Sequence, residues 1–206
     1  MQKVNHLQLL FWLTATCLCS CHSSLHSDGQ EWPLLALADS IELETSALES
    51  VSAEKAISAS QWAQENLREF ELLLEDEEMS VSREEGEIIS DVSRARRLLK
   101  DQSKRRESIA NSQKRTLLQL RGLAAAIGNG TTHDSQGTPI DSAYIALNLS
   151  VELQMGRTLK KSITETQTYA SRGIAIAERT KDKSDSLQTV LRGRLARLIL
   201  ERNSSE

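Results

Sequence analysis

Apolar residues recur every three or four positions over most of this 206-residue chain, from Leu34 almost to its C-terminal end. This spacing places them on one face of an α-helix, and over long segments it is typical of coiled coils and helical bundles. Residues that interrupt helices are scarce, because the chain has 9 glycines and only two prolines, Pro33 and Pro139. We therefore predict an all-α protein.

The clearest interruption is the Gly- and Thr-rich segment 128–139. Gly128 suits the left-handed position that ends a helix. Thr138, Pro139 and Asp141 suit, in that order, an N-cap, a first-turn proline and an acidic first turn. A helix over 139–202 follows from this pattern, with a length of about 90 Å.

A second interruption is predicted at about 76–81, because Ser82 and Glu85 fit a capping box that begins a new helix. The expected helices are then about 34–78, 82–127 and 139–202. The alternative is one helix from 34 to 127, since no proline intervenes and the apolar spacing continues through this region. Either way we expect an elongated helical hairpin or a three-helix bundle of long coiled-coil-like helices.

The apolar stripe of these helices is expected to be a buried seam. Small and polar residues occur often in it, so packing should be thin and stability modest. In the third segment the predicted seam begins with Ile140, Tyr144, Leu147, Val151, Met155, Leu159 and Ile163.

The first residues have the pattern of a secretory signal peptide. Lys3 precedes an apolar run from Leu7 to Cys19, and a Ser- and His-rich exit follows. We predict a signal peptide at 1–21, a flexible lead-in at 22–33, a single helical domain at 34–202 and a tail at 203–206. The expected location is therefore secreted or extracellular.

All three cysteines, Cys17, Cys19 and Cys21, fall in this first segment. A disulfide-rich extracellular scaffold is thereby excluded for the mature chain. An alternative is that residues 18–21 form a loose bacterial lipobox, with Cys21 carrying the lipid of a membrane-anchored envelope lipoprotein.

Charge along the chain suggests several surfaces. The net charge of −4 does not favour a nucleic-acid partner. A basic block over Arg94–Arg115 could bind a polyanion, and the amphipathic stretch Leu187–Arg202 could lie on an anionic membrane surface. We favour a structural role for both, with Glu65 and Glu69 near Arg94–Arg97 across the turn.

An acidic cluster over 75–87 could bind Ca²⁺ weakly or dock a basic partner, but it lacks the spacing of a calcium loop. We favour a solvated turn.

Candidate modification sites are the three N-glycosylation sequons at Asn129, Asn148 and Asn203. Asn129, in the expected loop, is the best acceptor, followed by Asn203 near the end, and Asn148 inside a helix is the poorest. The sequence Arg94-Ala-Arg-Arg97 resembles a proprotein-convertase site, so a precursor cut near Arg97 is a further alternative.

No catalytic motif is present in the sequence, and we predict no enzyme activity, cofactor or metal site. His22 and His26 are close together but have no third ligand at metal-binding spacing. The sequence favours a non-enzymatic secreted or surface helical protein that acts through protein–protein interaction or self-association.

Overall fold

The computed structural model describes residues 29–205, which form five α-helices and no β-strand beyond one isolated bridge between His133 and Pro139. The predicted all-α class is therefore confirmed. The helices are α1 (Trp32–Ser50), α2 (Ala53–Leu73), α3 (Arg83–Leu99), α4 (Gln102–Gly128) and α5 (Ser142–Ser205). The predicted signal peptide and the lipidation candidate Cys21 lie outside the described residues.

The turn between α2 and α3 lies where the capping box placed it. The Ser82 hydroxyl accepts a hydrogen bond from the Glu85 amide at 3.2 Å, and the Glu85 carboxylate accepts one from the Ser82 amide at 2.8 Å. These bonds satisfy two of the amides that a helix start leaves without partners. The alternative of one helix from 34 to 127 is wrong.

An unpredicted break at Val51 and Ser52 separates α1 from α2. The Ser52 hydroxyl accepts from the Lys55 amide at 3.1 Å, as an N-cap residue does. Across the core, the Arg106 guanidinium of α4 donates to the carbonyls of Leu48 at 3.2 Å and Val51 at 2.7 Å. Arg106 therefore supplies the donors that the C-terminal end of α1 needs.

A second unpredicted break separates α3 from α4 at Asp101, which has a φ of 59°. This left-handed conformation is unusual for a residue with a Cβ. Because neither glycine nor proline is present at this point, the sequence carries no local signal of the break.

The last helix begins later and ends later than predicted. The Asp141 carboxylate accepts from the Tyr144 amide at 2.8 Å, so Asp141, not Thr138, caps α5. Pro139 therefore precedes the helix, and residues 203–205, expected as a tail, are its last turn.

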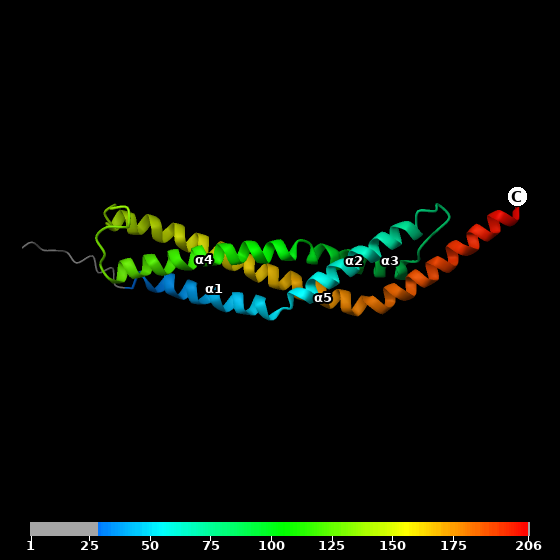
Figure 1. Cartoon of the computed structure of the whole chain (residues 1–206), viewed down its shortest axis with the longest axis horizontal. Helices are drawn as coiled ribbons and strands as arrows, with labels where there is room; N and C mark the ends of the chain where they lie inside the picture. Colours follow the sequence, from blue (N-terminus) through cyan, green and yellow to red (C-terminus); the bar gives the residue numbers. More distant parts are fainter. Residues whose placement is uncertain (1–28, 206) are drawn as a thin grey trace, which may run out of the picture.

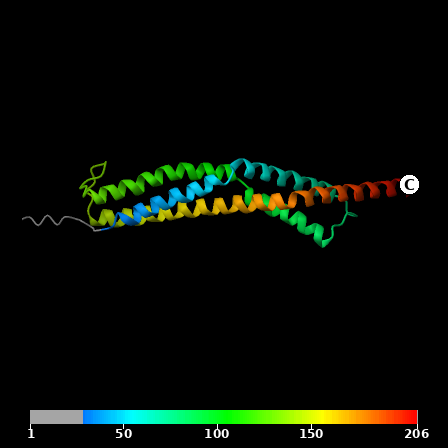
Figure 2. The same cartoon turned by 90° about the horizontal axis from the view of Figure 1, so that it is seen from below.

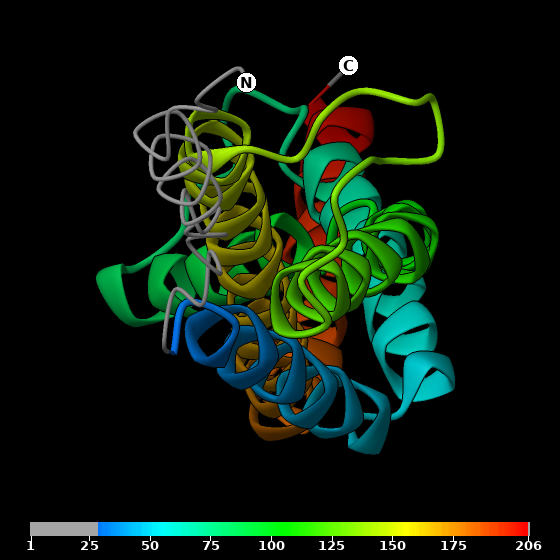
Figure 3. The same ribbon diagram turned by 90° about the vertical axis from the view of Figure 1, so that its left-hand side faces the viewer.

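The molecule is a long rod organised around α5 (Figures 1 and 2). Helices α1 and α4 pack along the first half of α5, and α2 and α3 pack along its second half. Viewed from one end, α1, α4 and the first half of α5 occupy three corners of a triangle (Figure 3). Each half of the rod is therefore a three-helix arrangement, and α5 is common to both.

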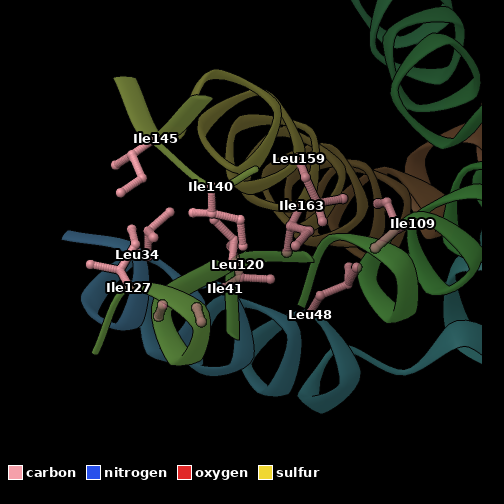
Figure 4. Close-up of a cluster of buried hydrophobic side chains, with 12 residues drawn as sticks. Leu34, Ile41, Leu48, Ile109, Leu120, Ile127, Ile140, Ile145, Leu159 and Ile163 are labelled. Carbon is pink, nitrogen blue, oxygen red and sulfur yellow. The ribbon is translucent and has the colours of Figure 1, made fainter. Parts of the chain in front are cut away.

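Each half has its own apolar core. In the first half, aliphatic residues of α1, α4 and α5 meet, with Leu34, Ile41, Leu120 and Ile163 completely enclosed (Figure 4). The second core is formed by α2, α3 and α5. Its buried members are Ala63, Phe70, Leu73, Val92, Ala95, Ile176, Ala177, Leu187 and Leu191.

The second core also encloses a polar group. The Asn66 side-chain oxygen of α2 accepts from the Ser184 hydroxyl at 2.6 Å and from the Gln188 amide at 2.8 Å, both on α5. The Asn66 amide donates to the Trp62 carbonyl at 2.9 Å. Buried polar contacts of this kind fix the register of two helices, because a slip would leave their groups unsatisfied.

The middle of α5 lets its neighbours approach closely through small residues. A Cβ placed on Gly173 would lie 2.5 Å from Cγ of Leu99, which is almost completely buried at the end of α3. Gly173 therefore gives space to Leu99 at the point where the chain passes from α3 to α4.

We predict that Gly173→Ala lowers the free energy of unfolding by about 1–3 kcal/mol, because its methyl group overpacks against Leu99. Gly193 is a matched control on the same helix, since nothing lies within 4 Å of its Cβ position. Gly193→Ala should raise stability by about 0.5–1 kcal/mol through helix propensity alone. Urea unfolding followed by circular dichroism measures both, and equal effects of the two substitutions would contradict the close contact.

We further predict that Asn66→Ala costs about 2–3 kcal/mol, because the Ser184 and Gln188 donors lose a buried acceptor. Asn111, exposed on α4, provides the control, and Asn111→Ala should change stability by less than about 0.5 kcal/mol. The same urea titration applies, and a near-neutral Asn66→Ala would show that the buried network contributes nothing.

Candidate interaction surfaces

A groove of about 470 Å³ runs between α4 and α5 in the first half of the rod. Its apolar lining consists of Ile109 and Leu159, which are buried, and of Val151 and Met155, which are partly exposed. Hydroxyl and amide side chains complete it, and its lining includes no residue of α1. The polar lining residues are Ser108, Ser112, Arg115, Thr116, Gln119, Gln154, Thr158 and Ser162.

The groove continues toward the junction of α3 and α4. A second hollow shares Ser108, Ile109 and Ser162 with it and extends to Asp101. From Gln119 to Asp101 the two hollows follow α4 for 18 residues, about 27 Å of helix. This length is sufficient for a helix of five turns.

The groove lies on the side of α4 that faces away from α1. Arg121 contacts α1 through Glu42 at 2.7 Å. Ser112, which lines the groove, precedes Arg121 by nine residues and therefore lies about 180° away from it around the helix. The chain's own α1 therefore covers one side of α4 and leaves the other uncovered.

Three residues of the predicted seam are exposed here: Val151 and Met155 in the groove, and Leu147 beside it. The exposed fractions are 67% for Leu147, 43% for Val151 and 48% for Met155. They follow one another at intervals of four residues on α5, so they form one stripe. The sequence predicted that this stripe would be buried, but no helix of the described chain covers it.

The α4 edge of the groove is positively charged. Helix α4 contains six Lys or Arg residues and a single acid, Glu107. Arg106 and Arg121 are directed to α1, whereas Lys104, Arg105 and Arg115 line the groove and its extension. The Arg105 guanidinium also lies over the Tyr169 ring, 5.4 Å from its centroid, as in a cation–π contact.

The basic block Arg94–Arg115 is not one surface, because the break at Asp101 divides it between α3 and α4. Arg94 pairs with Asp91 at 3.4 Å, and Arg106 is half-buried at the α1–α2 junction, where burial lowers its pKa. The ion pair that the structure gives Glu69 is with Arg192 of α5, and the placement of Glu65 and Glu69 near Arg94–Arg97 stays a prediction.

The acidic cluster over 75–87 is bound by arginines from the end of α5. Arg202 makes two hydrogen bonds of 2.8 Å to Asp76 and lies 3.1 Å from Glu78. Arg194 donates to Glu85 at 2.6 and 3.0 Å. We call these pairs the C-terminal clasp, because they join the α2–α3 turn to α5.

The clasp changes the ionisation of its acids. Hydrogen bonds from Arg202 lower the pKa of Asp76, and hydrogen bonds from Arg194 lower that of Glu85. Within residues 29–205 no three His, Cys, Asp or Glu side chains gather as a metal site. The weak calcium site considered for this cluster therefore has no geometry to support it among these residues.

The clasp also occupies part of the stretch Leu187–Arg202 that could lie on a membrane. Leu187 and Leu191 are buried in the second core, while Ile199 and Leu200 remain exposed. Among the described helices, none combines the length and the apolar character that crossing a bilayer requires.

The modification candidates occupy different environments. Asn129 is exposed at the C-cap of α4, and Asn203 is exposed in the last turn of α5. Asn148 is half-buried within α5, and its amide donates to the Tyr144 carbonyl at 2.9 Å. Arg97 is exposed but helical, and it donates to the Ser93 hydroxyl at 3.0 Å. Of the three asparagines, Asn148 is the least exposed.

We predict that the clasp makes stability dependent on pH. Both carboxyl groups have a pKa in the folded chain that is lowered from its ordinary value of about 4. Their stabilising contribution is therefore complete at a pH above that ordinary value. This contribution is lost as the pH falls through the lowered pKa values. The difference in unfolding free energy between wild type and Arg194→Gln/Arg202→Gln should be largest at neutral pH and shrink toward zero at about pH 2.

The matched control for the clasp is Arg172→Gln, because Arg172 is exposed on α5 away from these acids. Urea titrations across the pH range test the three proteins. If the unfolding free energy of the double variant is lower than that of the wild type by the same amount at every pH, the arginines act without the carboxylates.

No family model, curated protein or solved structure was found to match this chain. What the protein does must therefore be inferred from its own surfaces.

Proposed function

We propose that the protein is a non-enzymatic extracellular helical protein that acts by binding a protein partner in the α4–α5 groove. The observation that carries this proposal is the exposed stripe Leu147, Val151 and Met155 beside the groove. A continuous exposed apolar stripe on a helix is typical of an interaction site. Its apolar surface stays in contact with water until a partner covers it, and covering it is favourable.

The shape and chemistry of the groove favour a helical partner. An amphipathic helix can place its apolar face on Ile109, Val151 and Met155, as in other helix-in-groove complexes. The serines and threonines of the lining are small, so a second helix can approach closely.

The charge of the groove favours an acidic partner. Arg115 and Lys104 lie along one edge and can pair with carboxylates flanking the apolar face of an incoming helix. Such pairs contribute to the association rate and to the choice of partner more than to affinity.

The extracellular location rests on the signal-peptide pattern at 1–21 and on the exposure of Asn129. Glycosylation at Asn129 would lie in the 129–141 loop, on the end of the rod beyond the groove. A glycan there would leave the groove open.

We predict that the groove binds an acidic amphipathic helix. A fluorescein-labelled 18-residue peptide with leucine on one helical face and glutamate on the other serves as the probe. Fluorescence anisotropy should show saturable binding to the wild type, weakened by at least about tenfold in Met155→Glu, because a carboxylate would enter the apolar floor.

Two controls isolate the groove. Leu72→Glu places the same charge at an exposed apolar position on α2, and it should bind the peptide as the wild type does. A peptide with lysine in place of glutamate should bind poorly. Equal binding of the acidic peptide by wild type and Met155→Glu would contradict the proposal.

A further inference from the structure

The outer face of α1 carries a second exposed apolar stripe. Trp32 is 68% exposed and Leu43 is 71% exposed, although both are large apolar residues. Their spacing places them on one face of the helix together with Ala36 and Asp39, which are also exposed. Because the opposite face of α1 fills the first core, this helix is apolar on two sides.

The charge of α1 is the reverse of that of α4. Between Trp32 and Ser50 the chain has four acids and no lysine or arginine. Asp39 lies within the outer stripe and stays exposed, although it is also 3.9 Å from Arg121 of the same chain's α4. The α4–α5 groove thus faces solvent with an apolar floor and the cations Lys104, Arg105 and Arg115, and its extension also includes Asp101 and Glu165. The exposed charges of α1 are all carboxylates, beside apolar side chains.

Within the molecule, the acidic helix α1 already binds the basic helix α4. Glu42 of α1 pairs with Arg121 of α4, and Arg106 of α4 binds the carbonyls at the end of α1. The groove offers the same helix pair, α4 and α5, on the side that this α1 does not cover. A second α1 on that side would complete a four-helix arrangement.

The spacing of the two surfaces matches. From Trp32 to Leu43 the α1 stripe extends over eleven residues, about 16 Å, and from Gln119 to Ile109 the groove extends over ten residues of α4, about 15 Å. With Trp32 at the Gln119 end, Leu43 lies at Ile109. Asp39 then lies within one turn of Arg115.

This register also fixes the direction of the incoming helix. It runs antiparallel to α4, which is the direction that the chain's own α1 takes, since Glu42 pairs with Arg121 and Leu48 with Arg106. The apolar contacts and the approach of Asp39 to Arg115 can therefore form in one orientation.

We propose that the partner in the α4–α5 groove is a second copy of this chain, which inserts the outer face of its α1. This inference rests on the proposed function of the groove. Each molecule carries one groove and one α1 face, on different sides of the same half of the rod. The contact is therefore head-to-tail and continues from molecule to molecule instead of closing as a two-fold dimer.

Two exposed residues, one on each surface, provide the test. Leu43→Arg puts a cation on the α1 face but keeps the groove, and Arg115→Glu puts an acid in the groove but keeps the α1 face. The purified chain is studied under reducing conditions by analytical ultracentrifugation, after circular dichroism has shown that each variant is folded. Leu72→Arg, on α2, is the matched control.

The wild type and Leu72→Arg should form a series of assemblies that grows with concentration, while Leu43→Arg and Arg115→Glu should each be monomeric. An equimolar mixture of the two monomeric variants should form a 1:1 complex that grows no further, because each supplies the surface that the other has kept. This complementation is specific to head-to-tail docking.

A wild type that is monomeric throughout, a Leu43→Arg variant that assembles as the wild type does, or a mixture that stays monomeric would each overturn the inference. The peptide measurement separates this failure from that of the proposed function. If the acidic peptide still binds the wild type and not Met155→Glu, the groove remains a binding site for another acidic helix.

Discussion

The packing of four helices against one continuous helix, α5, is the constraint on which the rest of the described structure depends. A single helix can pack against neighbours on several sides only if small residues leave room for the larger side chains of those neighbours. Gly156 and Gly173 are both buried where a Cβ would collide with Leu37 or Leu99. Two buried hydroxyls of α5 have partners: Thr166 donates to the Ser162 carbonyl at 2.7 Å, and Ser184 donates to Asn66 at 2.6 Å. The seam is therefore thin, and these polar groups keep hydrogen bonds within it. Four other buried side-chain atoms have no hydrogen-bond partner in the described chain: Trp62 Nε1, Gln102 Oε1, Arg106 Nε and Glu152 Oε2.

Two features of this fold could be predicted from neighbouring residues in the sequence. Helical spacing indicated the all-α class, and the capping box of Ser82 and Glu85 located the start of α3. The breaks after α1 and α3 escaped prediction for different reasons. The first break is stabilised by Arg106, which is distant in sequence. The second depends on the left-handed conformation of Asp101, where the sequence has neither glycine nor proline. The groove was equally hidden, because Leu147, Val151 and Met155 have the spacing of buried residues and only the arrangement of the helices leaves them exposed.

The arginines show how the same fold divides its charges between internal support and external contact. Arg106 and Arg121 hold α1 against α4, and Arg194 and Arg202 hold the α2–α3 turn against α5. Arg115 and Lys104 remain along the groove. With α1 on one side only, the first half of the rod has three of the four helices that a bundle of this geometry accommodates. The proposed interaction follows from that incomplete packing.

The continuity of α5 is the central claim, and the distance between its two halves tests it most directly. Spin labels at the exposed positions Ser150 and Ala196 report this distance by pulsed electron resonance in a chain with serine at its three cysteine positions. An unbroken helix places the two backbone sites about 69 Å apart, with a narrow distribution. A broad distribution centred below about 50 Å would mean that α5 bends back on itself, and the shared helix on which both cores depend would not exist.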